Sequence, residues 1–212
     1  MCNLYSLTKG QAVIREHFRV KYERTGDLPL FPSICPEQLA PIARIGADGE
    51  RELVLARWGI PFAAPVRKVP ITRIRYVRSQ RWRPFLGLPN RCVIPATSFC
   101  EWADMRSHKT PKWFALGEGR PLFAFAGLWT RWRGAHRFKE GDRQVFGVLT
   151  TEANAAVASI HGKAMPVILA APAEVDRWLE AEIGEALSLQ RPLPNGGLQI
   201  VATGEEEDRP FV

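Results

Sequence analysis

The segment RCVIPATSFCEW (91–102) opens the part of the sequence that decides the fold. Three further apolar runs follow it, at KWFAL (112–116), LFAFAGLWTRW (122–132) and QVFGVLTT (144–151). Turns that contain glycine separate these runs, which is typical of strands joined in succession. Because Pro95 cannot donate a hydrogen bond to a strand ladder, we expect an edge or a bulge there.

The rest of the chain adds shorter elements. Further strands are predicted at 52–60, 71–77, 164–169 and 198–202, and helices at about 9–21, 152–160 and 171–183. The first helix has a capping-box pattern, Thr8 followed by Gln11, and the second has Thr151 as a candidate N-cap. The segment 24–50 is rich in proline and glycine and is expected to be irregular. Strands dominate, so we predict an α+β fold with a mostly antiparallel, barrel-like sheet and a few flanking helices.

Length and composition indicate a globular chain. With 212 residues, we expect one domain over 1–203 and a loose, charged tail, GEEEDRPFV (204–212). No apolar run reaches the ~18 residues of a membrane span, and the start lacks the pattern of a secretory signal. The four cysteines form no CxxC pair and no Cys/His ligand spacing. We therefore expect a cytoplasmic protein without a metal, a cofactor or a membrane partner.

The net charge of +7 has a local origin. Residues 1–52 hold seven basic and seven acidic residues, and residues 101–212 hold thirteen and fifteen. Residues 53–100 hold nine basic residues and no acidic one. This basic segment includes Tyr76 and Trp82, a pattern suited to a polyanion whose bases can stack. A solvated basic face that only aids solubility is the alternative.

Cys2 is a candidate nucleophile. Removal of Met1 is usual before a small side chain and would leave an α-amine and a thiol on one residue, with reference pKa values of about 7.7–8.0 and about 8.5. Such a 1,2-aminothiol captures aldehydes, because the amine forms a Schiff base that the thiolate closes into a thiazolidine. The alternative is a small apolar residue that enters the first strand.

Two further residues could transfer protons. Glu101 is the first acidic residue after the basic segment and lies among aromatic residues, so burial would raise its pKa and nearby arginines would lower it. His161 lies between a predicted helix and a predicted strand, where a histidine can titrate near neutral pH. A structural ion pair for Glu101 and a helix-end cap for His161 are the alternatives.

The predicted strand ITRIRYV alternates with a period of two. Thr72, Ile74 and Tyr76 are predicted on one face, and Arg73 and Arg75 on the other. Guanidinium forks match phosphate oxygens in two-pronged contacts, so the two arginines could bind a phosphate. Surface solubility is again the alternative.

Together these residues resemble the SRAP family (SOS-response-associated peptidase), the abasic-site-crosslinking proteins. The resemblance runs in order through MC at the start, ARWGIP (56–61), ITRIRYV (71–77), NRCVIPATSFCEW (90–102), FAGLWTRW (125–132), LTTEAN (149–154) and IHGKAMPVIL (160–169). It covers nearly the whole chain, and the order and spacing of these motifs make chance agreement improbable.

The resemblance implies a monomeric, nucleoid-associated protein that binds single-stranded DNA and captures abasic sites as a thiazolidine at Cys2. It implies that Glu101 positions the N-terminus and shuttles a proton, and that His161 assists sugar ring opening and crosslink reversal. Arg75 matches an arginine that holds phosphate, and autopeptidase removal of Met1 is a further family activity. Other DNA contacts are expected from Trp58, Arg78, Trp82, Thr150, Thr151 and Lys163.

The sequence departs from the family pattern at three places. Arg73 stands where the family usually has an asparagine that contacts the abasic sugar. Arginine is longer and only donates, so it could hold an extra phosphate or crowd the pocket and slow ring closure. Asn3 and Leu4 replace a common Gly-Arg pair, which removes one phosphate contact, and Lys163 could supply the charge of a common arginine.

Two other function classes stay open. One is a cysteine-dependent peptidase with a protein substrate, which the uncompensated basic segment disfavours because peptides do not need so many cations. The other is a non-catalytic single-strand-binding module whose chemistry Arg73 has disabled.

Overall fold

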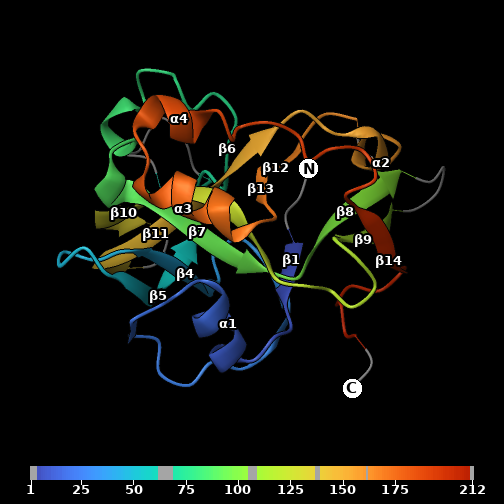
Figure 1. The fold of residues 1–212 in the computed structure, drawn as a ribbon, viewed down its shortest axis with the longest axis horizontal. Coiled ribbons are helices and arrows are strands. Elements are labelled where there is room, and N and C mark those ends of the chain that lie inside the picture. The colour runs from blue at the N-terminus through green and yellow to red at the C-terminus, as the bar shows by residue number, and fades with distance from the viewer. Residues whose placement is uncertain (1–3, 62–68, 105–108, 137–138, 161, 211–212) are drawn as a thin grey trace.

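The computed structural model describes residues 4–61, 69–104, 109–136, 139–160 and 162–210. Figure 1 shows two β-sheets side by side, with helices packed on the outside of the larger one. None of the helices in these ranges is long and apolar enough to cross a membrane.

Five strands of the larger sheet close into a barrel. In order around the barrel they are β11 (Lys139–Thr151), β10 (Phe123–His136), β7 (Arg91–Ala96), β4 (Leu39–Ile45) and β5 (Arg51–Trp58). These neighbours pair antiparallel, and a parallel ladder closes the ring, with Val145 opposite Arg57 and Phe146 opposite Trp58. The predicted α+β class with a mostly antiparallel, barrel-like sheet is confirmed.

Four short strands extend the barrel. They are β2 (Tyr22–Glu23) beside β5, β6 (Arg73–Ile74) and β12 (Met165–Pro166) beside β11, and β13 (Ile168–Leu169) beside β10. The predicted strand at 164–169 is thus divided in two. The division falls at Val167, whose N–H donates to Leu149 and whose carbonyl accepts from Ala126.

The second sheet is antiparallel and carries the described start of the chain. Its order is β14 (Gln199–Thr203), β9 (Lys109–Ala115), β8 (Ser98–Asp104), β1 (Leu4–Leu7) and β3 (Phe31–Ile34). The two sheets share one core, because the Tyr5 ring lies 5.2 Å from Trp58 and 5.6 Å from Phe125, measured between ring centroids. The predicted strand at 91–102 is therefore two strands in two sheets, and Thr97 between them donates its N–H to the carbonyl of Ser6.

The described residues form four helices outside the two sheets. They are α1 (Gln11–His17), α2 (Ala155–Ala158), α3 (Pro172–Glu180) and α4 (Ile183–Leu187), with two 3-10 turns, η1 (Arg83–Phe85) and η2 (Leu88–Asn90). Helix α3 crosses β7 (Figure 1) and buries Trp178, whose indole N–H donates to the Cys92 carbonyl at 2.9 Å. Arg91 then donates to the carbonyls of Trp178 and Ala181, which satisfies acceptors at the end of the helix.

Several local predictions need correction. Helix α1 begins at Gln11 with Gly10 as its N-cap, because the Thr8 hydroxyl bonds to Thr97 and the Gln11 side chain accepts from Leu28. The N-cap of α2 is Asn154 rather than Thr151, and its side chain accepts from the Val157 N–H.

Three segments also differ from their predictions. The range 24–50 is not irregular, since it contains β3 and β4, and α4 was not predicted. In the strand predicted at 71–77 only Arg73–Ile74 forms a strand, and Ile71 makes an isolated bridge to Ile60. Ile74 is buried but Tyr76 is 80% exposed, so the two do not share a face. In the segment predicted as a loose tail, residues 204–206 and 209 are exposed, whereas Asp208 is completely buried.

Close packing inside the barrel gives a test of the fold. A Cβ added at Gly127 would lie 2.3 Å from Ile94 Cδ1 and 3.0 Å from the Gly147 carbonyl oxygen. We expect Gly127→Ala to lower the free energy of unfolding by about 1–3 kcal/mol in urea titrations, because such overpacking shifts the backbone. Gly184→Ala is the control, since nothing lies within 4 Å of its added Cβ. Equal stability of the two variants would contradict this packing.

Candidate functional site: a cationic groove

A groove of about 530 Å³ opens beside β6 and the end of β11. It is lined by Pro36, Val69, Pro70, Ile71, Thr72, Arg73, Arg75, Tyr76, Thr150, Lys163 and Ala164. Four residues predicted to act on DNA, Arg73, Arg75, Thr150 and Lys163, therefore share one concave surface. Among the described residues, no acidic one is part of this lining.

Backbone pairing positions the groove arginines. Strand β6 runs parallel to β11, with Arg73 opposite Val148 and Ile74 opposite Leu149. Because Ile74 is buried in the core, strand alternation turns Arg73 toward the other side. Gln190 then holds the segment in place, since its side-chain amide donates to the carbonyls of Arg75 (2.7 Å) and Thr150 (3.0 Å).

Sequence reasoning did not single out Gln190. Its two acceptors lie 115 and 40 residues away along the chain. No local pattern marks a glutamine in the loop after α4 as a clamp on the groove.

The guanidinium groups of the groove have unused donors. Nη1 of Arg73 and Nη1 of Arg75 are shielded from solvent and have no hydrogen-bond partner among the described residues. Arg75 Nη2 lies 3.6 Å from Glu152 Oε1, but the Glu152 side chain is 81% exposed, so solvent weakens this pair. Buried cationic donors without acceptors are suited to the oxygens of an anion.

The aromatic residues are placed differently from the prediction. Trp58 is 1% exposed, stacks on Phe146 and donates to the Thr72 carbonyl, and Trp82 is 5% exposed against Phe85. Both rings are therefore buried in the core rather than exposed at the groove. The exposed aromatic residue of the groove lining is Tyr76.

Two further predicted contacts lie outside the groove lining. Arg78 is exposed but is not among the lining residues. Thr151 is buried in the ladder between β11 and β12, where it lies opposite Met165. Neither residue is brought into contact with the groove.

Glu101 is a buried carboxylate at the centre of the second sheet. It is 0% exposed, lies opposite Lys112 of β9, and both of its carboxylate oxygens are shielded from solvent. The preceding residue, Cys100, lies opposite Leu4, the first residue of β1. Glu101 is therefore one residue from the point at which the described start of the chain joins β8.

Cys2 and His161 lie outside the described residues. Their nearest described neighbours along the chain are Leu4, at the start of β1, and Ile160 and Gly162. Lys163, two positions after His161, lines the groove.

The other cysteines are poor nucleophiles. Burial raises the pKa of the Cys100 thiol to about 12 and the pKa of the Cys92 thiol further. Partial burial, with a smaller contribution from Glu206, also raises the pKa of the Cys35 thiol. These three residues are free thiols that stay protonated near neutral pH.

Metal chemistry has no ligand set in the described part of the chain. No group of three or more His, Cys, Asp or Glu side chains lies close enough there to hold an ion.

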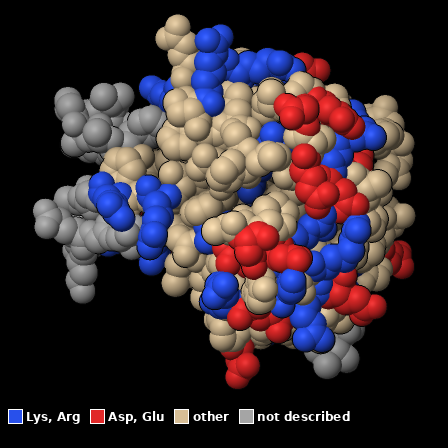
Figure 2. Space-filling model, turned by 60° about the vertical axis from the view of Figure 1, so that its left-hand side comes forward, with Lys and Arg blue, Asp and Glu red and all other residues tan. Residues whose placement is uncertain are grey.

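Charge is unevenly distributed over the surface. Figure 2 shows a face on which acidic and basic side chains are interleaved, while the coloured side chains at its left edge are all basic. On this face the positive excess lies at one edge, and a local excess can attract a polyanion.

Comparison with known proteins identifies the family. The chain matches the model of the family described as SOS response associated peptidase (SRAP) over residues 1–205. Abasic site processing protein YoaM of Bacillus subtilis (strain 168) is 31% identical over 186 residues, covering 84% of this chain and 79% of the relative. Abasic site processing protein YobE of the same organism is 31% identical over 179 residues, covering 80% and 78%.

Solved structures agree on the fold. A crystal structure of a protein from Bordetella bronchiseptica has a TM-score of 0.75 and 22% identity, covering 96% of this chain and 98% of its own. One from Bacteroides thetaiotaomicron has a TM-score of 0.72 and 19% identity, covering 93% and 90%. The family match includes β8 and β9, which surround Glu101, and every residue that lines the groove. It confirms the resemblance seen in the sequence: the chain belongs to the SOS response associated peptidase (SRAP) family.

Proposed function

We propose that this protein processes abasic sites in single-stranded DNA and captures their aldehyde at Cys2. The observation that carries the proposal is the groove, whose described lining includes Arg73, Arg75 and Lys163 and no acidic residue. The names of the curated relatives, abasic site processing proteins, supply the substrate class.

The DNA would lie in the groove with its phosphates on the cations. Arg73, Arg75 and Lys163 provide charge, and the Thr150 side chain can hydrogen-bond to a phosphate oxygen. Tyr76 is exposed at the same surface and offers a ring on which a base can stack, an interaction worth about 1–3 kcal/mol per base. Bases are free to stack in this way in single strands, which favours single-stranded over duplex DNA.

The chemistry starts from a chain without Met1. The α-amine of Cys2 adds to the aldehyde carbon, and loss of one water gives the Schiff base. The thiolate then adds to the imine carbon and the nitrogen takes up a proton, which closes the five-membered thiazolidine. The aldehyde and the aminothiol are converted to the thiazolidine and water, so no oxidant, metal or cofactor takes part.

Glu101 is proposed as the proton shuttle. Cys2 comes two positions before Leu4 in the sequence. Leu4 in turn lies opposite Cys100, next to Glu101. The carboxylate would take a proton from the ammonium group and deliver it to the leaving hydroxyl. His161, close in sequence to Lys163, is proposed to assist sugar ring opening and crosslink reversal.

A denaturing gel tests the proposal. Protein with a mature N-terminus, verified by mass spectrometry, is mixed with labelled single-stranded DNA that contains one abasic site. We expect a slower band that is stable without reductant and is absent when the site carries an intact base. Binding without this band would support the non-catalytic module instead, and cleavage of protein substrates without the band would support a peptidase.

Arg73 provides a separate test within the groove. Asparagine is shorter and both donates and accepts, so Arg73→Asn is expected to relieve the crowded pocket and to speed capture severalfold, on the order of 1 kcal/mol in the barrier. Binding of intact single-stranded DNA should weaken, because one cation is lost. Arg73→Lys is the control that keeps the charge. A capture rate unchanged in Arg73→Asn would show that Arg73 does not limit ring closure.

A further inference from the structure

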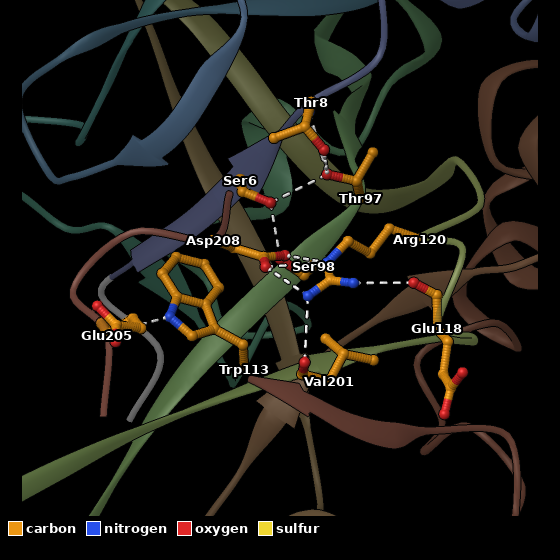
Figure 3. Close-up of polar contacts among 10 residues, drawn as sticks. All are labelled: Ser6, Thr8, Thr97, Ser98, Trp113, Glu118, Arg120, Val201, Glu205 and Asp208. Atoms are coloured by element: carbon orange, nitrogen blue, oxygen red, sulfur yellow. Dashed lines mark hydrogen bonds and ion pairs between the residues drawn. The ribbon is translucent and has the colours of Figure 1, made fainter. Parts of the chain in front are cut away.

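We infer that residues 204–210 form a strap that positions β1 against β8, with Asp208 as a positioning residue for capture. The inference rests on the proposed function for its consequence, but its structural part stands separately. The family match ends at residue 205, before Asp208. Figure 3 shows the polar contacts that anchor the strap.

The Asp208 carboxylate is the anchor. It is 0% exposed, and Arg120 Nε donates to both of its oxygens at 2.9 Å. Arg120 Nη2 lies 2.8 Å from Oδ1, and the Ser98 hydroxyl donates to Oδ2 at 2.5 Å. The Asp208 N–H donates to the Pro32 carbonyl at 3.0 Å. A buried carboxylate is stable only when it is paired and hydrogen-bonded in this way.

Arg120 is held in an unfavourable backbone conformation. It lies in the turn between β9 and β10 with φ of 47°, a left-handed value that side chains other than glycine rarely adopt. Its Nη1 donates to the Glu118 carbonyl at 2.8 Å, and its Nη2 donates to the Val201 carbonyl at 3.1 Å. The guanidinium therefore joins a turn, the strand β14 and the strap in a single network.

A chain of hydroxyl groups connects the anchor to β1. Ser98 Oγ lies 2.6 Å from Ser6 Oγ, and these two residues are directly opposite in the ladder between β8 and β1. Ser6 Oγ lies 3.0 Å from Thr97 Oγ1, which also accepts from the Thr8 N–H at 3.1 Å. Figure 3 shows this continuous line from Thr8 to Asp208. One serine thus separates the buried charge from the strand that carries the N-terminus.

The strap has a second attachment at the start of β1. The indole N–H of Trp113 donates to the Glu205 carbonyl at 2.8 Å, and Trp113 packs in a small buried cluster with Leu4 and Cys100. Leu4 and Cys100 are opposite each other, two residues from the serine pair. The strap therefore supports two successive pairs on one face of the β1–β8 ladder.

This arrangement controls where the reacting groups lie. Side chains alternate along β8, so Glu101 faces away from the strap while its backbone is fixed by it. Strand β1 has only four residues, and short terminal strands open easily unless they are tied down. Covalent reactions between positioned groups are sensitive to displacements of about 1 Å. The contacts of the strap involve none of the groove residues, so DNA binding should not depend on it.

Asp208→Asn tests the strap, with Glu206→Gln as the matched control. Both variants remove one negative charge from the strap, but Glu206 is exposed. The covalent capture rate at saturating protein is measured beside the Kd for single-stranded DNA with a reduced abasic site that lacks the aldehyde. In Asp208→Asn we expect capture to slow about tenfold and the Kd to change less than twofold. In Glu206→Gln both should stay within twofold of the wild type.

Hydrogen exchange gives a readout that does not depend on capture. Amides of residues 4–8 and 98–101 should exchange faster in Asp208→Asn, whereas those of β7 in the barrel should not change. Ser98→Ala, which leaves the Arg120–Asp208 pair in place, should give the same pattern more weakly and serves if Asp208→Asn does not fold.

The outcomes separate the two proposals. Absence of a covalent band in the wild type overturns the proposed function, while local exchange still decides on the strap. If Asp208→Asn and Ser98→Ala both keep the wild-type capture rate and the wild-type amide exchange, the strap inference is overturned. Faster exchange throughout the molecule, the barrel included, also overturns it, because Asp208 would then contribute general stability rather than position.

Discussion

Cys2→Ala is expected to abolish the stable covalent adduct with abasic single-stranded DNA, and to change DNA affinity less than twofold. Alanine keeps the α-amine, so a Schiff base can still form, but no thiol closes it and water reverses it. The denaturing gel should therefore show a band only after borohydride reduction. A stable band without reductant would contradict the thiazolidine chemistry.

We do not expect the remaining cysteines to replace Cys2 as the nucleophile in this test. Cys92 and Cys100 are buried and their thiol pKa values are raised by burial, so neither replaces Cys2 as a nucleophile. Cys35 is only partly buried, and Cys35→Ala is the appropriate control. We expect it to capture DNA at the wild-type rate.

Glu101→Gln is expected to slow capture about 100-fold or more, with little change in DNA affinity. Proton transfer by a positioned group contributes about 10²–10⁴-fold, and glutamine cannot accept the proton. The site is completely buried, and glutamine fills nearly the same volume, so the fold should be kept. The rate of adduct formation is measured from pH 5 to 9 at saturating protein. The pH profile of the wild-type rate should include the titration of a carboxylate. The profile of Glu101→Gln should lack it.

Two controls accompany Glu101→Gln. Urea titration verifies that the variant is folded under the assay conditions, and Glu101→Asp restores the carboxylate on a shorter side chain. Partial recovery in Glu101→Asp is expected if the carboxylate acts on the proton. A Glu101→Gln rate within threefold of the wild type would assign Glu101 a structural role opposite Lys112.

The strands could be predicted where long apolar runs coincide with turn residues. β5, β9, β10 and β11 were found because their runs are long and their flanks contain glycine or proline. β3 and β4 were missed because Pro32 and Pro41 lie within them, and proline disfavours a strand in local reasoning. Which strands close the barrel could not be predicted, since the closing ladder pairs residues near 57 with residues near 145 and has no local signal.

The candidate site was predicted in part, for a similar reason. Arg73, Arg75, Thr150 and Lys163 are recognisable from motifs, and the structure brings them together. The burial of Trp58 and Trp82 could not be predicted, because an aromatic residue in a basic segment looks the same in the sequence whether it fills the core or faces solvent. The role of Asp208 could not be predicted from the sequence, because its hydrogen-bond partner Ser98 is 110 residues away.

The separation of Ser98 and Asp208 in the sequence also determines the order in which the parts of the site are synthesised. β1 leaves the ribosome first and can pair with β3 early, but its other ladder partner, β8, is synthesised only 92 residues after Ser6. The strap follows 110 residues after Ser98, a delay on the order of 10 s at typical rates of synthesis. On the proposed function, a nascent chain therefore carries an unshielded aminothiol with slow, unassisted reactivity, and efficient capture begins only once translation has delivered the strap.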